Sequence, residues 1–167
     1  MKMFLALFLL AVICSCTAQD KKIIGLSKLP LTNLTVGFYH IELTDRNWFE
    51  ADIFCRSNNL ALVSFETKTE QDVVFAELQR LGIHANAFWT SGNDLAMEAT
   101  YFWSQTGRPF GFTSWAPNEP NNAGGAENCV TLTHSMNTPR WNDGACSSRR
   151  WSICELPTAC WGYPFTA

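Results

Sequence analysis

The chain has little charge and no strong excess of either sign. Only 16% of its 167 residues are charged, and the formal net charge is −3. This balance gives no electrostatic reason to expect binding to nucleic acid or to anionic membranes. Because 47% of the residues are hydrophobic, a globular core is expected and disorder is not.

The sequence also lacks the patterns of common catalytic sites. No Ser-His-Asp or Cys-His arrangement stands out, and the 3 histidines have no evident partners. We therefore expect no enzymatic activity. The absence of repeats, charge runs and low-complexity tracts, together with the length, predicts a single domain with short tails.

Long apolar runs are missing except near the N-terminus. There Lys2 precedes an apolar run from Phe4 to Ile13, and small residues follow as far as Ala18. The run is shorter than the roughly 20 residues needed to cross a bilayer. The pattern predicts a signal peptide at residues 1–18 and a mature protein that is secreted and extracellular.

Secretion decides how the remaining cysteines are interpreted. An oxidising destination favours disulfides over metal thiolates, but the sequence alone does not choose among the pairings of Cys55, Cys129, Cys146 and Cys154. Cys160 is left over. An odd cysteine in a secreted protein predicts either an intermolecular bridge or a capped free thiol.

Periodicity predicts two helices followed by a loop-rich half with short strands. Apolar residues at three- and four-residue steps predict a helix over 44–58. Thr67 and Glu70 form a capping box that opens a second helix, which Gly82 ends. The expected strands are 38–43, 60–65, 88–90 and 101–103. This order predicts an α+β domain.

Oxygen-bearing side chains gather in the loop-rich half. The candidate ligands are Glu119, Asn121, Glu127, Asn142 and Asp143. Calcium takes about six to eight oxygens from carboxylates, amides and carbonyls in a flexible geometry. No His or Cys occurs among these residues in a zinc-like spacing, which disfavours a softer metal. The sequence therefore predicts a calcium ion (Ca2+) held by a loop.

The Glu119-Pro120-Asn121 triplet, the acidic residue before Cys129, the Trp141-Asn142-Asp143 triplet and the final Cys154 occur together in a characteristic order and spacing. In this the chain resembles C-type lectin domains over residues 36–157. The resemblance implies a short-form domain with two helices, antiparallel sheets and a long calcium-binding loop region. It leaves 19–35 as an N-terminal linker and 158–167 as a C-terminal tail.

The same resemblance implies two disulfides, Cys55–Cys154 and Cys129–Cys146, and a cis bond between Glu119 and Pro120. The five calcium ligands would also bind a carbohydrate, because two neighbouring sugar hydroxyls complete the calcium shell. The auxiliary calcium site of the family maps to Asp94, Glu98, Asn122, Glu127 and Asn128. Two of these are amides where the family has carboxylates, so we expect this site to be weak or empty.

The implied function is that of a secreted, calcium-dependent lectin. The order Glu119, Pro120, Asn121 implies a preference for mannose, N-acetylglucosamine or fucose-type sugars. We expect recognition of glycans on microbial or cellular surfaces in innate immunity, by several copies acting together. The alternative is a protein-binding module that acts through a partner or a second copy linked by Cys160.

Two smaller expectations remain. Asn33 begins the sequon Asn33-Leu34-Thr35 and is a candidate for N-glycosylation. Trp115 and Trp141 lie next to the candidate ligands, but Trp is more often part of a core. We expect both to be chiefly structural.

Overall fold

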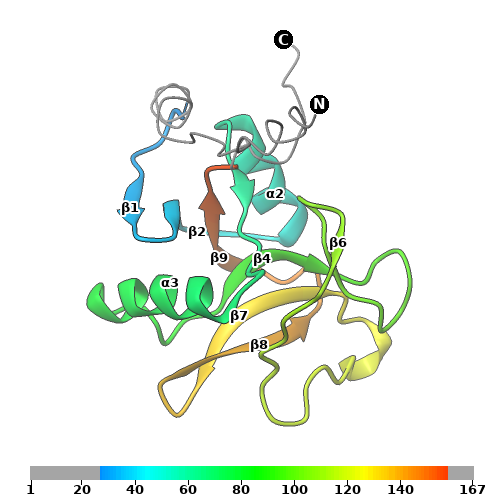
Figure 1. The fold of residues 1–167 in the computed structure, drawn as a ribbon. Coiled ribbons are helices and arrows are strands. Elements are labelled where there is room, and N and C mark those ends of the chain that lie inside the picture. The colour runs from blue at the N-terminus through cyan, green and yellow to red at the C-terminus, as the bar shows by residue number, and fades with distance from the viewer. Residues whose placement is uncertain (1–26, 158–167) are drawn as a thin grey trace, which may run out of the picture.

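The computed structural model describes residues 27–157. In chain order the elements are β1 Thr32–Leu34, β2 Gly37–Arg46, α2 Trp48–Ser57, β3 Ala61–Leu62, α3 Lys68–Arg80, β4 Phe88–Asn93, β5 Phe102–Trp103, β6 Arg108–Pro109, the 3-10 turn η1 Ala123–Gly125, β7 Cys129–Ser135, β8 Thr138–Gly144 and β9 Arg150–Glu155 (Figure 1). None of the helices in this part of the chain is long and apolar enough to cross a membrane. The expected signal peptide and Cys160 lie outside the described residues.

The strands form one connected sheet in the order β1-β2-β9-β4-β5-β6, and β3 also pairs with β9. The β7–β8 hairpin joins through the pairing of β7 with β4. Every pairing is antiparallel except that of β4 with β9, which is parallel. With two helices beside this sheet, the fold is α+β, as predicted. Figure 1 shows the hairpin extending away from β2 and α2, with the long segment between β6 and β7 beside it.

The first helix begins later than the sequence predicts. Residues 44–46 belong to β2, and α2 begins at Trp48. Asn47 is its N-cap, with its side chain accepting from the Glu50 N–H at 2.8 Å, while the Asn47 N–H donates to Glu50 Oε2 at 3.0 Å. This reciprocal capping box satisfies two N–H groups and sets the start of the helix. The prediction of a helix from Thr44 was wrong because apolar spacing does not reveal this cap.

The second helix agrees more closely with its prediction. Thr67 is the N-cap of α3 and accepts from the Glu70 N–H at 3.2 Å. The helix ends at Arg80, and Gly82 then adopts φ +72°, a left-handed conformation that glycine tolerates without a steric penalty. The strand expected over 60–65 is shorter, because regular pairing covers only Ala61 and Leu62.

Two disulfides cross-link distant parts of the fold, in the pairing that the resemblance implied. Cys55–Cys154 joins α2 to β9 across 99 residues, and Cys129–Cys146 closes the β7–β8 hairpin across 17 residues. All of these except Cys146 are fully buried. A cluster that includes Trp48 and Trp89 packs around both bridges, so each disulfide lies within apolar packing rather than at the surface.

We expect the two disulfides to differ in their contribution to stability. In the chain-entropy model, a loop of about 100 residues contributes about 4.7 kcal/mol and one of about 15 residues about 3 kcal/mol. A Cys55→Ala/Cys154→Ala variant should therefore lose more free energy of unfolding than a Cys129→Ala/Cys146→Ala variant. Urea denaturation of both variants measures this difference. Equal losses, or a larger loss for the second variant, would contradict the chain-entropy explanation.

Two partly buried acidic side chains also lie between β2, α3 and β9. Glu155 Oε1 accepts from the Ser64 N–H at 3.0 Å, and the Tyr39 hydroxyl donates to Glu70 Oε1 at 2.8 Å. Removal from water raises the pKa of Glu155 well above its usual value, and the nearby charges of Glu70 and Glu66 raise it further. Between the usual Glu pKa and this raised value, the folded protein binds more protons than the unfolded chain.

The free energy of unfolding should consequently fall as pH rises from about 4.3, the ordinary Glu pKa, through the raised pKa of Glu155. A Glu155→Gln variant retains an oxygen for the Ser64 N–H and removes the charge. Its free energy of unfolding should therefore fall less as pH rises. Urea denaturation between pH 5 and pH 8 measures the slope. Asp72→Asn, which removes a partly exposed carboxylate paired with Lys68 instead, is the control. An unchanged slope in Glu155→Gln would refute the assignment.

Candidate functional site

The segment before the Glu-Pro-Asn triplet is anchored along β8. The Trp141 N–H donates to the Ser114 carbonyl at 2.7 Å, and the Ala116 N–H donates to the Trp141 carbonyl at 2.8 Å. Trp115 and Trp141 thereby form a parallel bridge. These bonds bring the chain that leads to Glu119 alongside the strand that carries Asn142 and Asp143.

Asp143 holds the next part of this loop. It is fully buried, and its two carboxylate oxygens accept from the N–H groups of Asn121 at 3.2 Å and Asn122 at 2.8 Å. The Tyr101 hydroxyl lies 3.4 Å from the Asp143 Oδ2 atom. Burial raises the pKa of Tyr101, and the adjacent Asp143 charge raises it further, so the hydroxyl remains a donor. The sequence did not identify Tyr101, because its aromatic neighbours suggested only a strand.

Glu119 has an unpartnered carboxylate oxygen and a raised pKa. Its bond to Pro120 is cis, as the resemblance implied, and its Oε1 accepts from Asn121 Nδ2 at 2.9 Å. Its second oxygen, Oε2, is buried with no hydrogen-bond partner among residues 27–157. Burial raises the pKa of Glu119 to about 7, and neighbouring Asp143 and Glu127 add to the rise. Asp143 and Glu127 therefore lie close enough to disfavour the charge of Glu119.

Glu127 and Asn122 close the far side of the loop. The Ala123 N–H donates to Glu127 Oε2, and the Glu127 N–H donates to Asn122 Oδ1, both at 3.0 Å. Between them the chain makes the short turn η1, in which Gly124 has φ +69° and Gly125 has φ +68°. Side chains are strained at such angles, so the two glycines permit the turn. The remaining ligand candidate, Asn142, donates from Nδ2 to the carbonyl of the next residue.

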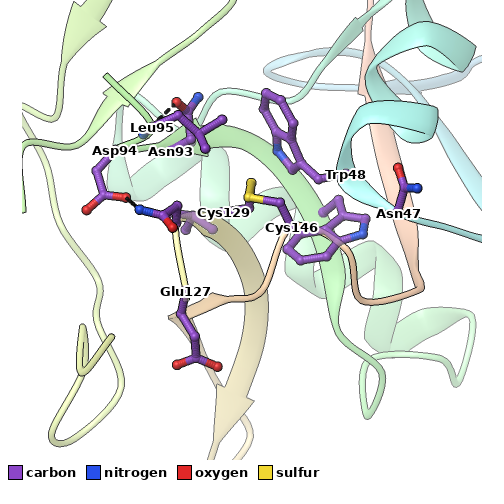
Figure 2. Close-up of a disulfide and its surroundings, with 12 residues drawn as sticks. Asn47, Trp48, Asn93, Asp94, Leu95, Glu127, Cys129 and Cys146 are labelled. Carbon is purple, nitrogen blue, oxygen red and sulfur yellow. Dashed lines mark hydrogen bonds between the residues drawn. A yellow bond between two sulfur atoms is a disulfide. The ribbon is translucent and has the colours of Figure 1, made fainter. Parts of the chain in front are cut away.

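The residues of the expected auxiliary site also come together. Asn122 Nδ2 donates to Glu98 Oε1 at 2.7 Å, and Asn128 Nδ2 donates to Asp94 Oδ1 at 3.1 Å. Figure 2 shows Asp94 and Glu127 on one side of the Cys129–Cys146 disulfide, with Trp48 on the other. Because Asn122 bonds to the Asp143 carboxylate, to Glu127 and to Glu98, it connects the two sets of candidate ligands.

The chemistry of the main set suits a hard cation. Across the described part of the chain, no three His, Cys, Asp or Glu side chains form a metal-binding group on their own. The main set instead mixes three carboxylates with two amides, which is a calcium-type donor set. The Glu119 carboxylate has an unpartnered oxygen, and burial, with the charges of Asp143 and Glu127, raises its pKa. A bound cation would compensate its charge.

Both tryptophans pack in or against the core, as expected. Trp141 is fully buried, and Trp115 packs against it with their rings edge to face, 5.7 Å between centroids. Trp103 contacts Trp141 in the same way at 5.4 Å. Asn33, the candidate for glycosylation, is exposed on β1, so nothing in the fold covers its side chain.

Comparison with known proteins shows the family. A family model described as "Lectin C-type domain" matches residues 44–156. C-type lectin 37Da of Drosophila melanogaster is 35% identical over 135 residues, which cover 77% of this chain and 72% of the relative. C-type lectin mosGCTL-7 of Aedes aegypti is 36% identical over 115 residues, covering 65% of this chain and 76% of the relative.

Solved structures agree with this assignment. The C-type lectin CEL-I of Cucumaria echinata superposes with a TM-score of 0.68 at 26% identity, covering 78% of this chain and 99% of that one. The cow C-type carbohydrate-recognition domain of CD23, determined in the presence of a GlcNAc2Man3 oligosaccharide, gives a TM-score of 0.65 at 26% identity, with 77% and 95% coverage. The matched fold, the two disulfides and the sequence similarity lead to one conclusion: this chain belongs to the C-type lectin domain family.

Proposed function

We propose that this protein is a secreted, calcium-dependent lectin that binds mannose-type sugars through Glu119, Asn121, Glu127, Asn142 and Asp143. The observation that carries the proposal is the crowding of negative charge at Glu119. One of its oxygens is buried without a partner, and burial, with the charges of Asp143 and Glu127, raises its pKa. No Lys, Arg or His of residues 27–157 forms an ion pair with Glu119. Holding like charges together costs free energy, and a bound calcium ion offsets that cost.

When bound, calcium would supply a Lewis-acidic centre that attracts the oxygens of two adjacent sugar hydroxyls. The chain supplies the hydrogen bonds around it. Asn121 and Asn142 offer amide donors, and Glu119 offers a carboxylate acceptor beside the Asn121 amide. A sugar hydroxyl both donates and accepts, so it can donate to a carboxylate and accept from an amide. It would replace the Asn121–Glu119 contact with two new hydrogen bonds.

The family resemblance supports a mannose-type preference. The order of carboxylate and amide in Glu119-Pro120-Asn121 matches the family's pattern for the equatorial 3- and 4-hydroxyls of mannose and related sugars. The similarity to a cow domain determined with a mannose-containing oligosaccharide is consistent with this preference. The auxiliary set around Asp94 is the weaker calcium site, because amides replace carboxylates at two of its positions.

Similarity to insect C-type lectins supports a wider biological role. We infer that the mature protein consists of the linker 19–35, the lectin domain 36–157 and the tail 158–167, and that it recognises glycans on microbial or cellular surfaces. One shallow site makes few contacts, so several copies would be needed for strong binding to a glycan array. No catalytic step is assigned to the site.

Calcium removal tests the central claim. The purified mature protein should bind mannose- or fucose-rich glycans on an array in calcium, and the signals should disappear in EDTA. Asn142→Ala removes an amide from the set and should weaken binding by roughly tenfold or more. Asn86→Ala is the control, because it removes an exposed amide that belongs to neither set of candidate ligands. A folded, multivalent protein without calcium-dependent signals would contradict the proposal and favour a protein partner.

Sugar preference should follow the order of the two ligands that flank Pro120. A Glu119→Gln/Asn121→Asp variant exchanges the amide and the carboxylate while keeping the set's total charge. Its preference should move from mannose towards galactose, because donors and acceptors then face the opposite hydroxyls. Competition by the two free sugars for an immobilised glycan measures the change. If the wild type already binds galactose more tightly, the mannose assignment is wrong.

A further inference from the structure

A half-open cavity of about 430 Å³ lies between the first turns of α3, residues 112–115 and the start of β8. Residues 112–115 come shortly before the Glu119-Pro120-Asn121 triplet. Its volume falls within the roughly 300–1,000 Å³ of small-molecule sites. The cavity contains none of the five proposed calcium ligands. Its walls include Lys68 and Gln71 from α3, Ser114 and Trp115 from the loop segment, and Arg140 from β8.

Arg140 brings an uncompensated positive charge to this cavity. No carboxylate of residues 27–157 forms an ion pair with it. Its Nη1 atom contacts only neutral oxygens, the Ser114 hydroxyl at 3.5 Å and the Pro139 carbonyl at 3.4 Å. Lys68, on the opposite wall, is paired with Asp72. The cavity therefore has a net positive charge in a protein whose overall charge is negative.

Gln71 adds an unused hydrogen-bond acceptor. The residue is 1% exposed, and its Nε2 donates to the Ser114 hydroxyl at 3.0 Å. The Ser114 hydroxyl in turn donates to the Pro139 carbonyl at 3.2 Å. Gln71 Oε1 has no partner among the described residues. A buried acceptor without a donor is costly, so the wall of the cavity behind Ser114 contains an unsatisfied polar group.

The cavity adjoins the proposed sugar site. Arg140 and Asn142 are two residues apart on β8, so their side chains project from the same face, about 7 Å apart along the strand. Thr113 and Thr138 contribute hydroxyls to the rim, and Trp115 contributes an aromatic ring. Such a mixture of hydroxyls, an aromatic ring and a cation suits a polar, anionic ligand with hydroxyl groups.

We propose that this cavity binds an anionic sugar unit, whose carboxylate or sulfate accepts from Arg140 and whose hydroxyls contact Thr113 and Thr138 at the rim. When the ligand is an oligosaccharide, the cavity would bind the anionic unit that is next to the sugar bound at Asn142. Simultaneous binding of one oligosaccharide at both places rests on the proposed function. Binding of a free anionic sugar in the cavity does not require calcium.

The test compares three mannose-containing trisaccharides that differ at one terminal unit: glucose, glucuronic acid or 6-sulfated glucose. Titration calorimetry in calcium should give about tenfold tighter binding for a charged form than for the neutral one, because hydrogen bonds to charged groups are the stronger ones. The charged form with the tighter binding identifies the preferred group. Arg140→Gln should abolish this preference and leave affinity for the neutral trisaccharide unchanged.

Arg150→Gln is the matched control, because Arg150 also has no ion pair with a described carboxylate but lies in a different surface cavity. It should retain the preference for the charged trisaccharide. Equal binding of all three trisaccharides by the wild type would overturn the proposal. So would a preference that survives Arg140→Gln, or one that Arg150→Gln removes as well.

A second arm separates this inference from the calcium-dependent function. In EDTA, titration with methyl glucuronide should shift the NMR signals of the Gln71 side-chain amide and the Arg140 guanidinium, whereas methyl glucoside should not. These shifts in a protein that fails to bind the neutral trisaccharide in calcium would support the cavity and refute the proposed function. Absent or identical shifts with the two methyl glycosides would overturn the cavity proposal, whatever happens in calcium.

Discussion

The loop that follows Pro120 depends on the carboxylate of Asp143. This side chain is fully buried on β8, and it accepts from two consecutive N–H groups, those of Asn121 and Asn122. Hydrogen bonds to charged groups contribute about 1.5–3 kcal/mol each, and a buried carboxylate without them would be unfavourable. The strand thus fixes the loop through a residue that also belongs to the proposed calcium shell. Loop geometry and ligand geometry are set by the same group.

The sequence predicted the parts of this molecule that depend on local chemistry or on family pattern. The α+β class, the second helix and the two disulfides agree with the structure. The start of α2 does not, because the Asn47–Glu50 capping box determines it and the strand β2 continues to Arg46. The parallel pairing of β4 with β9 joins residues some 60 positions apart, and no local pattern reports such a contact.

The candidate site divides in the same way. The structure connects Glu119, Asn121 and Asp143 by hydrogen bonds, and their role as ligands stays a prediction. It adds Tyr101, which reaches Asp143 from the segment before β5 and could not be linked to it by spacing. The cavity beside Arg140 was not predicted either, because Gln71 on α3 meets Ser114 only through tertiary packing. Residues that act through such contacts carry no distinctive signal in a single sequence.

The Cys129–Cys146 bridge has a further consequence for the strand that carries Asn142 and Asp143. It closes the β7–β8 hairpin into a covalent ring, and Met136 at the tip of that hairpin is 97% exposed. The tip is the natural place for a protease to cut. A single cut there would open the ring without releasing either strand, because the disulfide still joins the two halves near the ligands. A nicked molecule would then stay in one piece, with its ligand-bearing strand still paired to β7.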